Sequence, residues 1–280
     1  MPEIIKKIIR LLPNKAFVYL KFITRHKYIP NFKNWRSLNE YLNYVKLYDR
    51  NELRKTFCDR LAVREYVKLN APEVSLIPIL WIGTSLTQEV WDKLPQKFVI
   101  KAMHGSGMVK VIDKNNDKFQ TIRKQCDKWL VTDFAKYQRE WFYKGTPKVL
   151  VCEEMIGNGD VPPDFKFFVM NSKVEMIQVD VARFKGHKRA LLNRDFKRIA
   201  ATLRYPNADE IEKPKLISEA INIAEKLGYG FPFLRIDLYI LKDKIYFGEI
   251  TNSPGAGLEV FSPQNLDFEL GKKVRALKEV

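Results

Sequence analysis

Phe233-Leu-Arg-Ile-Asp-Leu-Tyr239, followed after a short turn by Ile245-Tyr-Phe-Gly-Glu-Ile-Thr251, decides how this chain folds. Both runs are rich in apolar and aromatic residues, and the polar turn Leu241-Lys-Asp-Lys244 separates them. Strand-forming runs around such a tetrapeptide predict a β-hairpin. Residues at about equal distance from the turn pair across a hairpin, so we expect Asp237 and Glu249 to lie close together on one face.

Two carboxylates on adjacent buried strands repel each other and lose hydration, and a cation between them relieves both penalties. Mg²⁺ suits these oxygen ligands because it usually binds one or two carboxylates together with substrate phosphates. The sequence therefore predicts a Mg²⁺ site at Asp237 and Glu249. The alternative is a solvated hairpin that carries two unrelated acids.

A second pair of strands surrounds a glycine turn in Phe98-Val-Ile-Lys-Ala-Met-His-Gly-Ser-Gly-Met-Val-Lys-Val-Ile112. Lys101 lies where the first strand ends, and small residues let backbone N–H groups approach phosphate oxygens closely. β-Branched residues follow the glycines, so this is not the phosphate loop that opens a helix. Either the segment is an ordinary tight turn, or it binds nucleotide phosphates through Lys101, His104, Gly105, Ser106 and Gly107.

The order and spacing of these segments resemble the ATP-grasp superfamily, and within it the TupA-like family of surface-polysaccharide biosynthesis proteins. The similarity runs from about residue 35 to about residue 271, and Asp59-Arg-Leu-Ala-Val-Arg-Glu-Tyr-Val67 resembles that family's opening helix. The other matching segments are Lys101 with His104-Gly-Ser-Gly107, Val151-Cys-Glu-Glu-Met-Ile156, Asp164-Phe-Lys-Phe-Phe168, Asp180-Val-Ala-Arg183, Arg235-Ile-Asp237, and Gly248-Glu-Ile-Thr251 with Pro254-Gly255.

The resemblance implies an α+β (mixed α/β) ATP-grasp fold, in which nucleotide lies between two subdomains that each contain an antiparallel sheet. We expect four parts: a basic amphipathic segment at 1–34, a helical/αβ subdomain at 35–97, a lid at 98–155, and a C-terminal subdomain with the metal site at 156–280. The patterns predict helices at 37–70, with Ser37 as N-cap, and at 86–94, 117–142 and 214–227, and strands at 79–82, 98–113, 148–152, 166–171 and 174–183.

Several nucleotide contacts are implied by the same resemblance. In the superfamily the chain crosses between subdomains near Val149–Ile156, and its backbone binds the adenine edge there. Glu153, Glu154 and Ile156 are the candidates. Asp164 matches the position that commonly holds the ribose hydroxyls.

The catalytic candidates are Lys101, Arg183 and Arg235, and Lys166 is a further candidate for binding the nucleotide. Lys166 could reach phosphate or the acid substrate, although an ordinary exposed strand face would look the same. Arg235 shares a strand face with Asp237, where it could neutralise a transferring phosphoryl group. Arg183 begins a basic stretch that extends to Arg189, which is either a solvated loop or a site for an anionic substrate.

Two positions depart from the superfamily pattern. Thr251 occupies the place of the usual asparagine ligand, with Asn252 one residue later, so both are candidate metal ligands. The usual Asp-Lys pair near the first helix reads Asp59-Arg60, so the role of the phosphate-binding lysine belongs to Arg60 or Lys55, or is absent.

Composition bounds the class of protein. The chain has 280 residues, 46% of them hydrophobic, enough for one large core or two small ones. Its three cysteines are widely spaced, which favours a reducing compartment over a disulfide framework. A formal charge of +16 attracts anionic partners. No nucleic-acid-binding motif is present, so no nucleic acid is expected.

The N-terminus, Met1-Pro-Glu-Ile-Ile-Lys-Lys-Ile-Ile-Arg-Leu-Leu-Pro13, is apolar and basic at near-helical spacing. It lacks the features of a signal peptide, and no apolar run is long enough to span a bilayer, so we expect a cytoplasmic protein. The segment predicts either a helix at the inner face of an anionic membrane or a helix docked on the protein's own core.

The resemblance implies an enzyme with ATP and Mg²⁺ as cofactors. The expected reaction is ATP-dependent ligation of a carboxylate to an amine through an acyl phosphate. The expected substrate is a precursor of a capsule or other surface polysaccharide, such as a uronic acid joined to an amino compound. The alternatives are a sugar or polyol phosphotransferase and a non-catalytic nucleotide-binding protein at the membrane surface.

Overall fold

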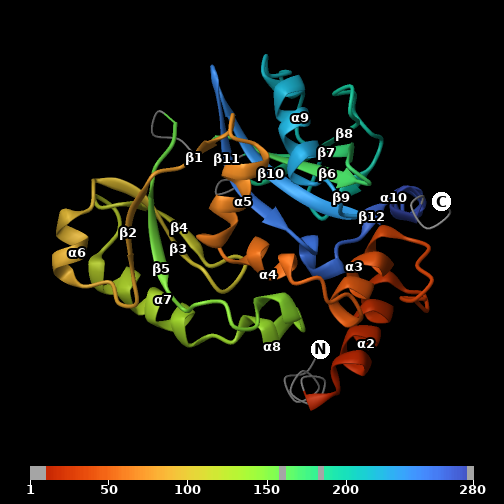
Figure 1. The fold of residues 1–280 in the computed structure, drawn as a ribbon, viewed down its shortest axis with the longest axis horizontal. Coiled ribbons are helices and arrows are strands. Elements are labelled where there is room, and N and C mark those ends of the chain that lie inside the picture. The colour runs from red at the N-terminus through yellow and green to blue at the C-terminus, as the bar shows by residue number, and fades with distance from the viewer. Residues whose placement is uncertain (1–10, 158–161, 182–185, 276–280) are drawn as a thin grey trace.

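A computed structural model describes residues 11–157, 162–181 and 186–275. Two β-sheets stand side by side and divide the molecule into two halves, with short helices between them (Figure 1). This is a mixed α/β fold with mainly antiparallel sheets, as the sequence predicts. The subdomain boundaries given above remain predictions.

The larger sheet contains six strands in the order β1–β11–β10–β6–β7–β8. Neighbours are antiparallel throughout, except that β1 runs parallel to β11. The predicted hairpin at 233–251 is therefore present, and β6 lies along its other edge. The strands are β1 (Ser75–Leu76), β6 (Asp164–Met170), β7 (Lys173–Val181), β8 (Lys188–Leu192), β10 (Phe233–Leu241) and β11 (Lys244–Thr251).

The smaller sheet has the order β2–β5–β3–β4 and is fully antiparallel. One of its faces packs against α6 (Gln88–Lys93) and α7 (Phe119–Val131) through the side chains of Trp91, Ile122 and Cys126. β2 comes from the region before residue 98, so this sheet takes a strand from outside the 98–155 segment. The strands are β2 (Ile79–Gly83), β3 (Lys97–Ala102), β4 (Val109–Asp113) and β5 (Leu150–Glu154).

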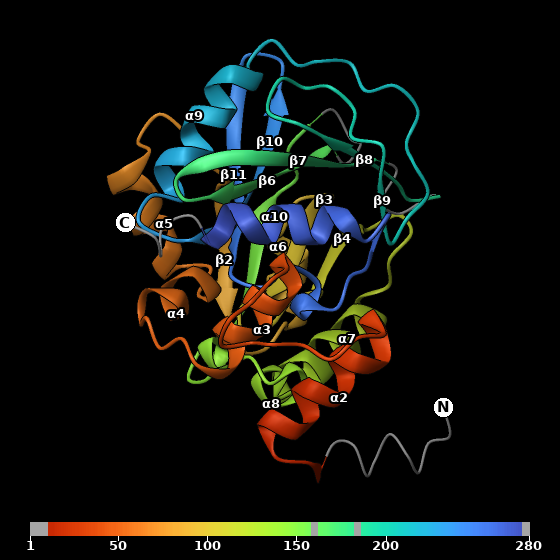
Figure 2. The ribbon, with the colours of Figure 1, turned by 90° about the vertical axis from the view of Figure 1, so that its right-hand side faces the viewer.

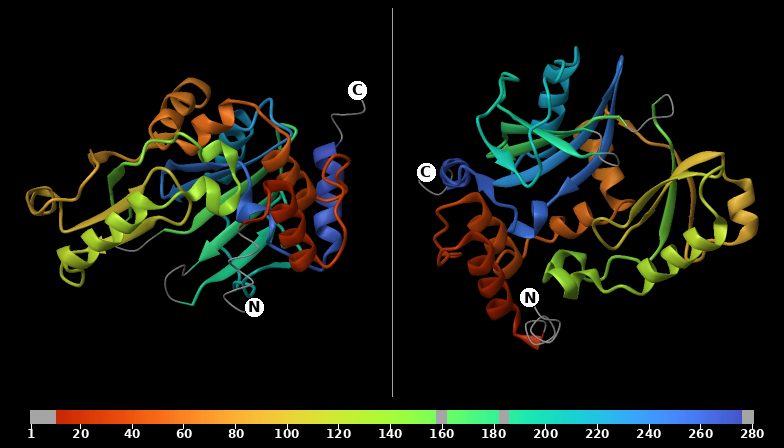
Figure 3. Two further views of the ribbon diagram at one scale, coloured as in Figure 1. Left: turned by 90° about the horizontal axis from the view of Figure 1, so that it is seen from below. Right: turned by 180° about the vertical axis from the view of Figure 1, so that it is seen from behind.

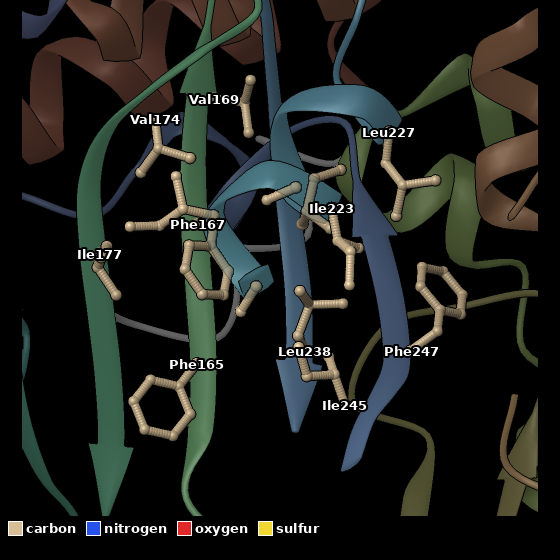
Figure 4. Packing of buried hydrophobic residues seen from close by; sticks show 14 of the residues in the cluster. Phe165, Phe167, Val169, Val174, Ile177, Ile223, Leu227, Leu238, Ile245 and Phe247 are labelled. Atoms are coloured by element: carbon tan, nitrogen blue, oxygen red, sulfur yellow. The ribbon is translucent and has the colours of Figure 1, made fainter. Parts of the chain in front are cut away.

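One face of the larger sheet is covered by α9 (Ile217–Leu227), whose apolar residues recur at helical spacing. Figure 4 shows Phe167 of β6 and Leu238 of β10 beside this helix, and Phe165 of β6 and Phe247 of β11 belong to the same buried cluster. Because side chains alternate along a strand, the residues between them point to the opposite face.

That opposite face changes character along its length. At one end, Phe168, Met176, Leu191 and Phe233 pack with α3 (Leu38–Leu47) and α10 (Asn265–Arg275). Figure 2 shows α10 lying across the sheet with α3 beneath it. At the other end the strands present charged side chains, among them Lys166, Arg235 and Asp237.

Local hydrogen bonds explain where predicted helices break. Ser37 caps α3, and its hydroxyl accepts from the Glu40 backbone N–H at 3.2 Å. The single helix expected at 37–70 is divided into three. The side chains of Asp49 and Asp59 accept hydrogen bonds from nearby backbone N–H groups, and these bonds replace the ones that would continue a helix. These helices are α3, α4 (Leu53–Cys58) and α5 (Ala62–Asn70).

The predicted helix at 117–142 also divides, because the Asp133 carboxylate accepts from the Lys136 N–H and begins a new helix there. The resulting elements are α7, α8 (Phe134–Gln138) and the 3₁₀ turn η1 (Trp141–Tyr143). The remaining elements are the 3₁₀ turn η2 (Pro254–Gly257) and a two-stranded sheet of β9 (Thr202–Leu203) and β12 (Phe261–Ser262).

The N-terminal segment lies partly outside the described residues, which begin at 11. Within them, α2 (Asn14–His26) packs Phe17, Val18 and Phe22 against Phe32. Figure 3 shows α2 and α3 at the end of the larger half. The aromatic part of the segment is thus docked on the protein itself. The prediction of membrane binding concerns mainly residues 1–10, which lie outside the described residues. None of the described helices has the length and apolarity to cross a bilayer.

Candidate active site

A β-bulge brings the two predicted metal ligands face to face. Leu238 pairs with Phe247, but the next pair is Asp237 with Glu249, so Gly248 has no partner of its own. An extra residue in one strand moves all later side chains to the other face. As a result Phe247 points into the core under α9, whereas Glu249 lies on the polar face with Asp237.

Three oxygens from three side chains surround one nitrogen atom of this face. Nη2 of Arg235 lies 2.7 Å from Oδ2 of Asp237, 3.1 Å from Oε1 of Glu249 and 3.0 Å from Oγ1 of Thr251. Nε of the same arginine donates to Oδ1 of Asp237 at 2.7 Å. The hairpin thus holds two carboxylates and a hydroxyl aimed at one positively charged point.

Lys166 adds a second cation from the neighbouring strand. Its ammonium group donates to Asp237 Oδ2 at 2.7 Å and also to Asp164. Burial raises the pKa of Asp237, while Arg235 and Lys166 oppose that rise. Burial alone would lower the pKa of Arg235, but Asp237 and Glu249 more than offset it, so the pKa is raised and the guanidinium keeps its charge.

These residues suit Mg²⁺ bound together with nucleotide phosphates. Within the described part of the chain there is no group of three or more His, Cys, Asp or Glu side chains placed to hold a metal by themselves. Mg²⁺ needs only one or two carboxylates when phosphates and waters complete its shell. Asp237 and Glu249 supply those, and their oxygens already converge on a cation, the Arg235 guanidinium.

A cleft between the two sheets extends from this cluster in both directions. Its middle is lined by Lys101, Ser106, Gly107, Asp164, Asp237 and Glu249. On one side it continues into a largely apolar slot lined by Ile77, Val99, Val111, Met155, Ile156 and Tyr239, and bounded by Glu153 and Glu154. One continuous cleft is therefore bordered by the end of β5 with the residues after it, 153–156, and by the glycine turn. These two segments are far apart in the sequence.

Lys101 lies between the apolar slot and the carboxylates, since it lines both parts of the cleft. Its ammonium group is largely buried and forms an ion pair with Glu153 on the adjacent strand. Alternation on β3 explains its direction, because Phe98 and Ile100 pack toward α7 and leave Val99 and Lys101 on the cleft side.

The glycine turn places its members differently. Ser106 and Gly107 border the cleft, and Gly107 has φ of 76°, which favours glycine. His104 is directed away from it, because Nε2 lies 2.8 Å from the backbone carbonyl of Trp129 at the end of α7. The structure therefore does not bring His104 to the phosphate region.

The side chains of Thr251 and Asn252 point to different partners. The Asn252 amide is buried and bonds Nη1 and the carbonyl of Arg54 at 3.1 and 2.9 Å. Only Thr251 of the two contacts the charged cluster, through Arg235 and through Glu249 at 3.2 Å. Asn252 thus stabilises the packing of α4 against the hairpin and does not point toward the carboxylates.

Arg183 lies outside the described residues. The basic stretch that it begins is not a solvated loop over its whole length, because Arg189 lies on β8 and is 5% exposed. Its Nε donates to Asp180 Oδ1 at 2.6 Å. Burial would raise the pKa of Asp180, but Arg189 overrides it and holds the pKa at about 2. The strand was not predicted because its sequence, Lys188-Arg-Ala-Leu-Leu192, does not alternate between polar and apolar residues.

A model of the TupA-like ATPgrasp family matches residues 40–275 of this chain. In a search of curated proteins, none matched this chain.

Three solved structures illustrate what the fold is similar to. D-alanine–D-alanine ligase from Bacillus anthracis, complexed with ATP, is 15% identical over 80% of this chain and 67% of its own, with a TM-score of 0.43. The ligase of the same name from Helicobacter pylori is 13% identical over 84% and 68%, with a TM-score of 0.44. VanG D-Ala:D-Ser ligase from Enterococcus faecalis is 16% identical over 79% and 62%, with a TM-score of 0.43.

Proposed function

Because this chain belongs to the TupA-like ATP-grasp family and is an ATP-dependent ligase, we propose that it joins a carboxylate to an amine through an acyl phosphate. The observation that carries the proposal is the convergence of Asp237, Glu249 and Thr251 on a single point of positive charge. Two carboxylates held in this way suit a metal–triphosphate complex, and a lysine stands beside them.

The nucleotide is proposed to lie along the cleft. Its adenine would enter the apolar slot and meet the backbone at 153–156, while the triphosphate would pass Lys101 and the turn at Ser106 and Gly107. Asp164 would accept from the ribose or stand beside the metal. Mg²⁺ bound by Asp237 and Glu249 would neutralise phosphate charge and orient the γ-phosphate.

In the first step an oxygen of the substrate carboxylate attacks the γ-phosphorus and ADP leaves. Lys101 and Arg235 would stabilise the charge that develops on the transferring group, because both are buried and positively charged beside the phosphate path. In the second step an amine attacks the acyl carbon, loses a proton and displaces inorganic phosphate, which gives an amide. Lys166, held by Asp164 and Asp237, would keep the carboxylates in place.

The substrate is proposed to be an acid or amine carried by a surface-polysaccharide precursor, on the family resemblance and the net charge of +16, which favours anionic substrates. Arg183 remains a candidate contact for it, outside the described residues.

Isotope transfer tests the reaction. A screen for ADP release would combine uronic acids with amino compounds, and active pairs would be repeated with ¹⁸O in the carboxylate. An acyl phosphate intermediate moves one ¹⁸O into the released phosphate, and mass analysis detects the amide. Phosphate that stays attached to the acceptor would instead identify a phosphotransferase. Absence of Mg·ATP binding would contradict both enzyme functions and favour a non-catalytic protein.

A further inference from the structure

Next to the carboxylates the cleft opens into a chamber. Its polar lining includes Arg60, Arg64, Tyr143, Glu153, Glu249 and Thr251, and we refer to it as the arginine chamber. It shares Arg60, Ser106 and Glu249 with the middle of the cleft. A group that reacts with the terminal phosphate would therefore have the rest of its structure in this chamber.

Arg60 is held weakly in the chamber. Its side chain is 17% exposed, and Nη1 lies 3.6 Å from Glu249 Oε2, which is longer than a hydrogen bond. Its Nε is buried and has no hydrogen-bond partner among the described residues. A buried donor without an acceptor costs free energy, so this guanidinium is well prepared to receive an anionic oxygen.

Arg60 precedes α5, Arg64 lies in the first turn of that helix, and both side chains line the chamber. Arg64 is half-buried, and its guanidinium makes no ion pair or hydrogen bond to any described residue. The acids of the chamber wall are already engaged, since Glu153 pairs with Lys101, and Glu249 is shared between Arg235 and Arg60. The charge of Arg64 therefore has no ion-pair partner among the described residues.

We propose that Arg60 and Arg64 bind a second anionic group of the acceptor acid, so that the substrate class is an acid with another carboxylate or a phosphate. Two guanidinium groups that line one chamber suit such a group because each offers paired N–H donors to its oxygens. This inference rests on the proposed ligase function, because that function brings the acceptor carboxylate to the terminal phosphate of the nucleotide.

Matched pairs of small acids test the proposal by calorimetry on the full chain. Glutarate is compared with its monoamide, and 3-phosphoglycerate with glycerate, each with and without Mg·ADP. In at least one pair we expect the acid with the additional anionic group to bind roughly ten- to a hundredfold more tightly than its monoanionic partner, the usual contribution of one charge-assisted contact. A difference in affinity within the glutarate pair would identify a carboxylate as the preferred group, and a difference within the phosphoglycerate pair would identify a phosphate.

Arg64→Gln should remove this preference and leave Mg·ADP affinity within about twofold of wild type. Arg123→Gln, an exposed arginine on α7, is the matched control and should retain it. Equal binding within both pairs, no binding by any of the four acids, or a preference that survives both Arg64→Gln and Arg60→Gln would overturn the proposal. Failure of the ligase function is seen separately, as loss of Mg·ADP binding or of ¹⁸O transfer.

Discussion

Asp237 and Glu249 face each other across the β10–β11 hairpin only because Gly248 is bulged out of the pairing. In a regular hairpin Asp237 would meet Gly248, and Glu249 would point into the core under α9. A Cβ atom on residue 248 would lie 2.9 Å from the backbone oxygen of Asp237, so the bulge requires glycine at this position.

Gly248→Ala should therefore lower the free energy of unfolding by about 1–3 kcal/mol, as expected for overpacking against backbone. It should also weaken Mg²⁺-dependent nucleotide binding, because relief of the contact moves Glu249 relative to Asp237. Chemical denaturation and a Mg²⁺ titration in the presence of ADP measure the two effects. Wild-type values in both would mean that the bulge does not position the carboxylates.

Asp237→Asn and Glu249→Gln should each abolish ADP release, because each removes one negative charge with little change in shape. Asp243→Asn in the exposed turn of the same hairpin is the control and should retain activity. Thermal melts accompany the assay, since Asp237 is buried between Arg235 and Lys166. Near-wild-type turnover in either variant would refute the metal assignment.

Lys101→Ala should weaken Mg·ATP binding by roughly ten- to a hundredfold, the usual contribution of one charge-assisted contact. Lys110→Ala is the matched control, because Lys110 lies beside Ile100 on the next strand and pairs with Asp117 instead. Equal affinities for the two variants would exclude Lys101 from the nucleotide site.

Thr251→Ala and Asn252→Ala should have different consequences. Loss of the Thr251 hydroxyl, which contacts Glu249 and Arg235, should raise the Mg²⁺ concentration needed for activity with little change in stability. Loss of the buried Asn252 amide leaves Arg54 groups unpaired and should cost about 1–3 kcal/mol of unfolding free energy. A shifted Mg²⁺ requirement in Asn252→Ala instead would make Asn252 the ligand.

Glu140 predicts a pH dependence of stability. Its carboxylate is buried beside Ser253 and Lys46, and burial raises its pKa to about 7, although Lys46 and the Ser253 hydroxyl oppose the shift. The folded state therefore binds this proton more tightly than the unfolded state does. The resulting stabilisation is complete below the unfolded pKa near 4.5 and is lost as the pH rises through about 7.

Urea denaturation of wild type and Glu140→Gln at pH 5 and pH 8 measures this contribution. We expect the variant to lose less stability between the two values, by about 1–3 kcal/mol. Burial lowers the pKa of Lys46 to about 8, so this group changes the stability at higher pH than Glu140 does. Lys46→Met is the control that measures the contribution of Lys46 to the pH dependence. Parallel profiles for wild type and Glu140→Gln would contradict the assignment.

The sequence by itself determined the elements that local patterns encode. Alternation around Leu241-Lys-Asp-Lys244 predicted the hairpin, the glycines after Lys101 predicted a strand–turn–strand unit, and Ser37 with Glu40 predicted the start of α3. These features depend on residues close together in the chain, whose periodicity and hydrogen bonding are visible without the rest of the protein.

Only the tertiary structure decided which side chains meet. The bulge at Gly248 sets the face of Glu249, Arg54 of a distant helix draws Asn252 away from the carboxylates, and Asp180 buries Arg189 of an unpredicted strand. Each outcome depends on contacts between segments far apart in sequence. Such contacts select one of two strand faces or one of several buried partners, and a local pattern contains no information about that choice.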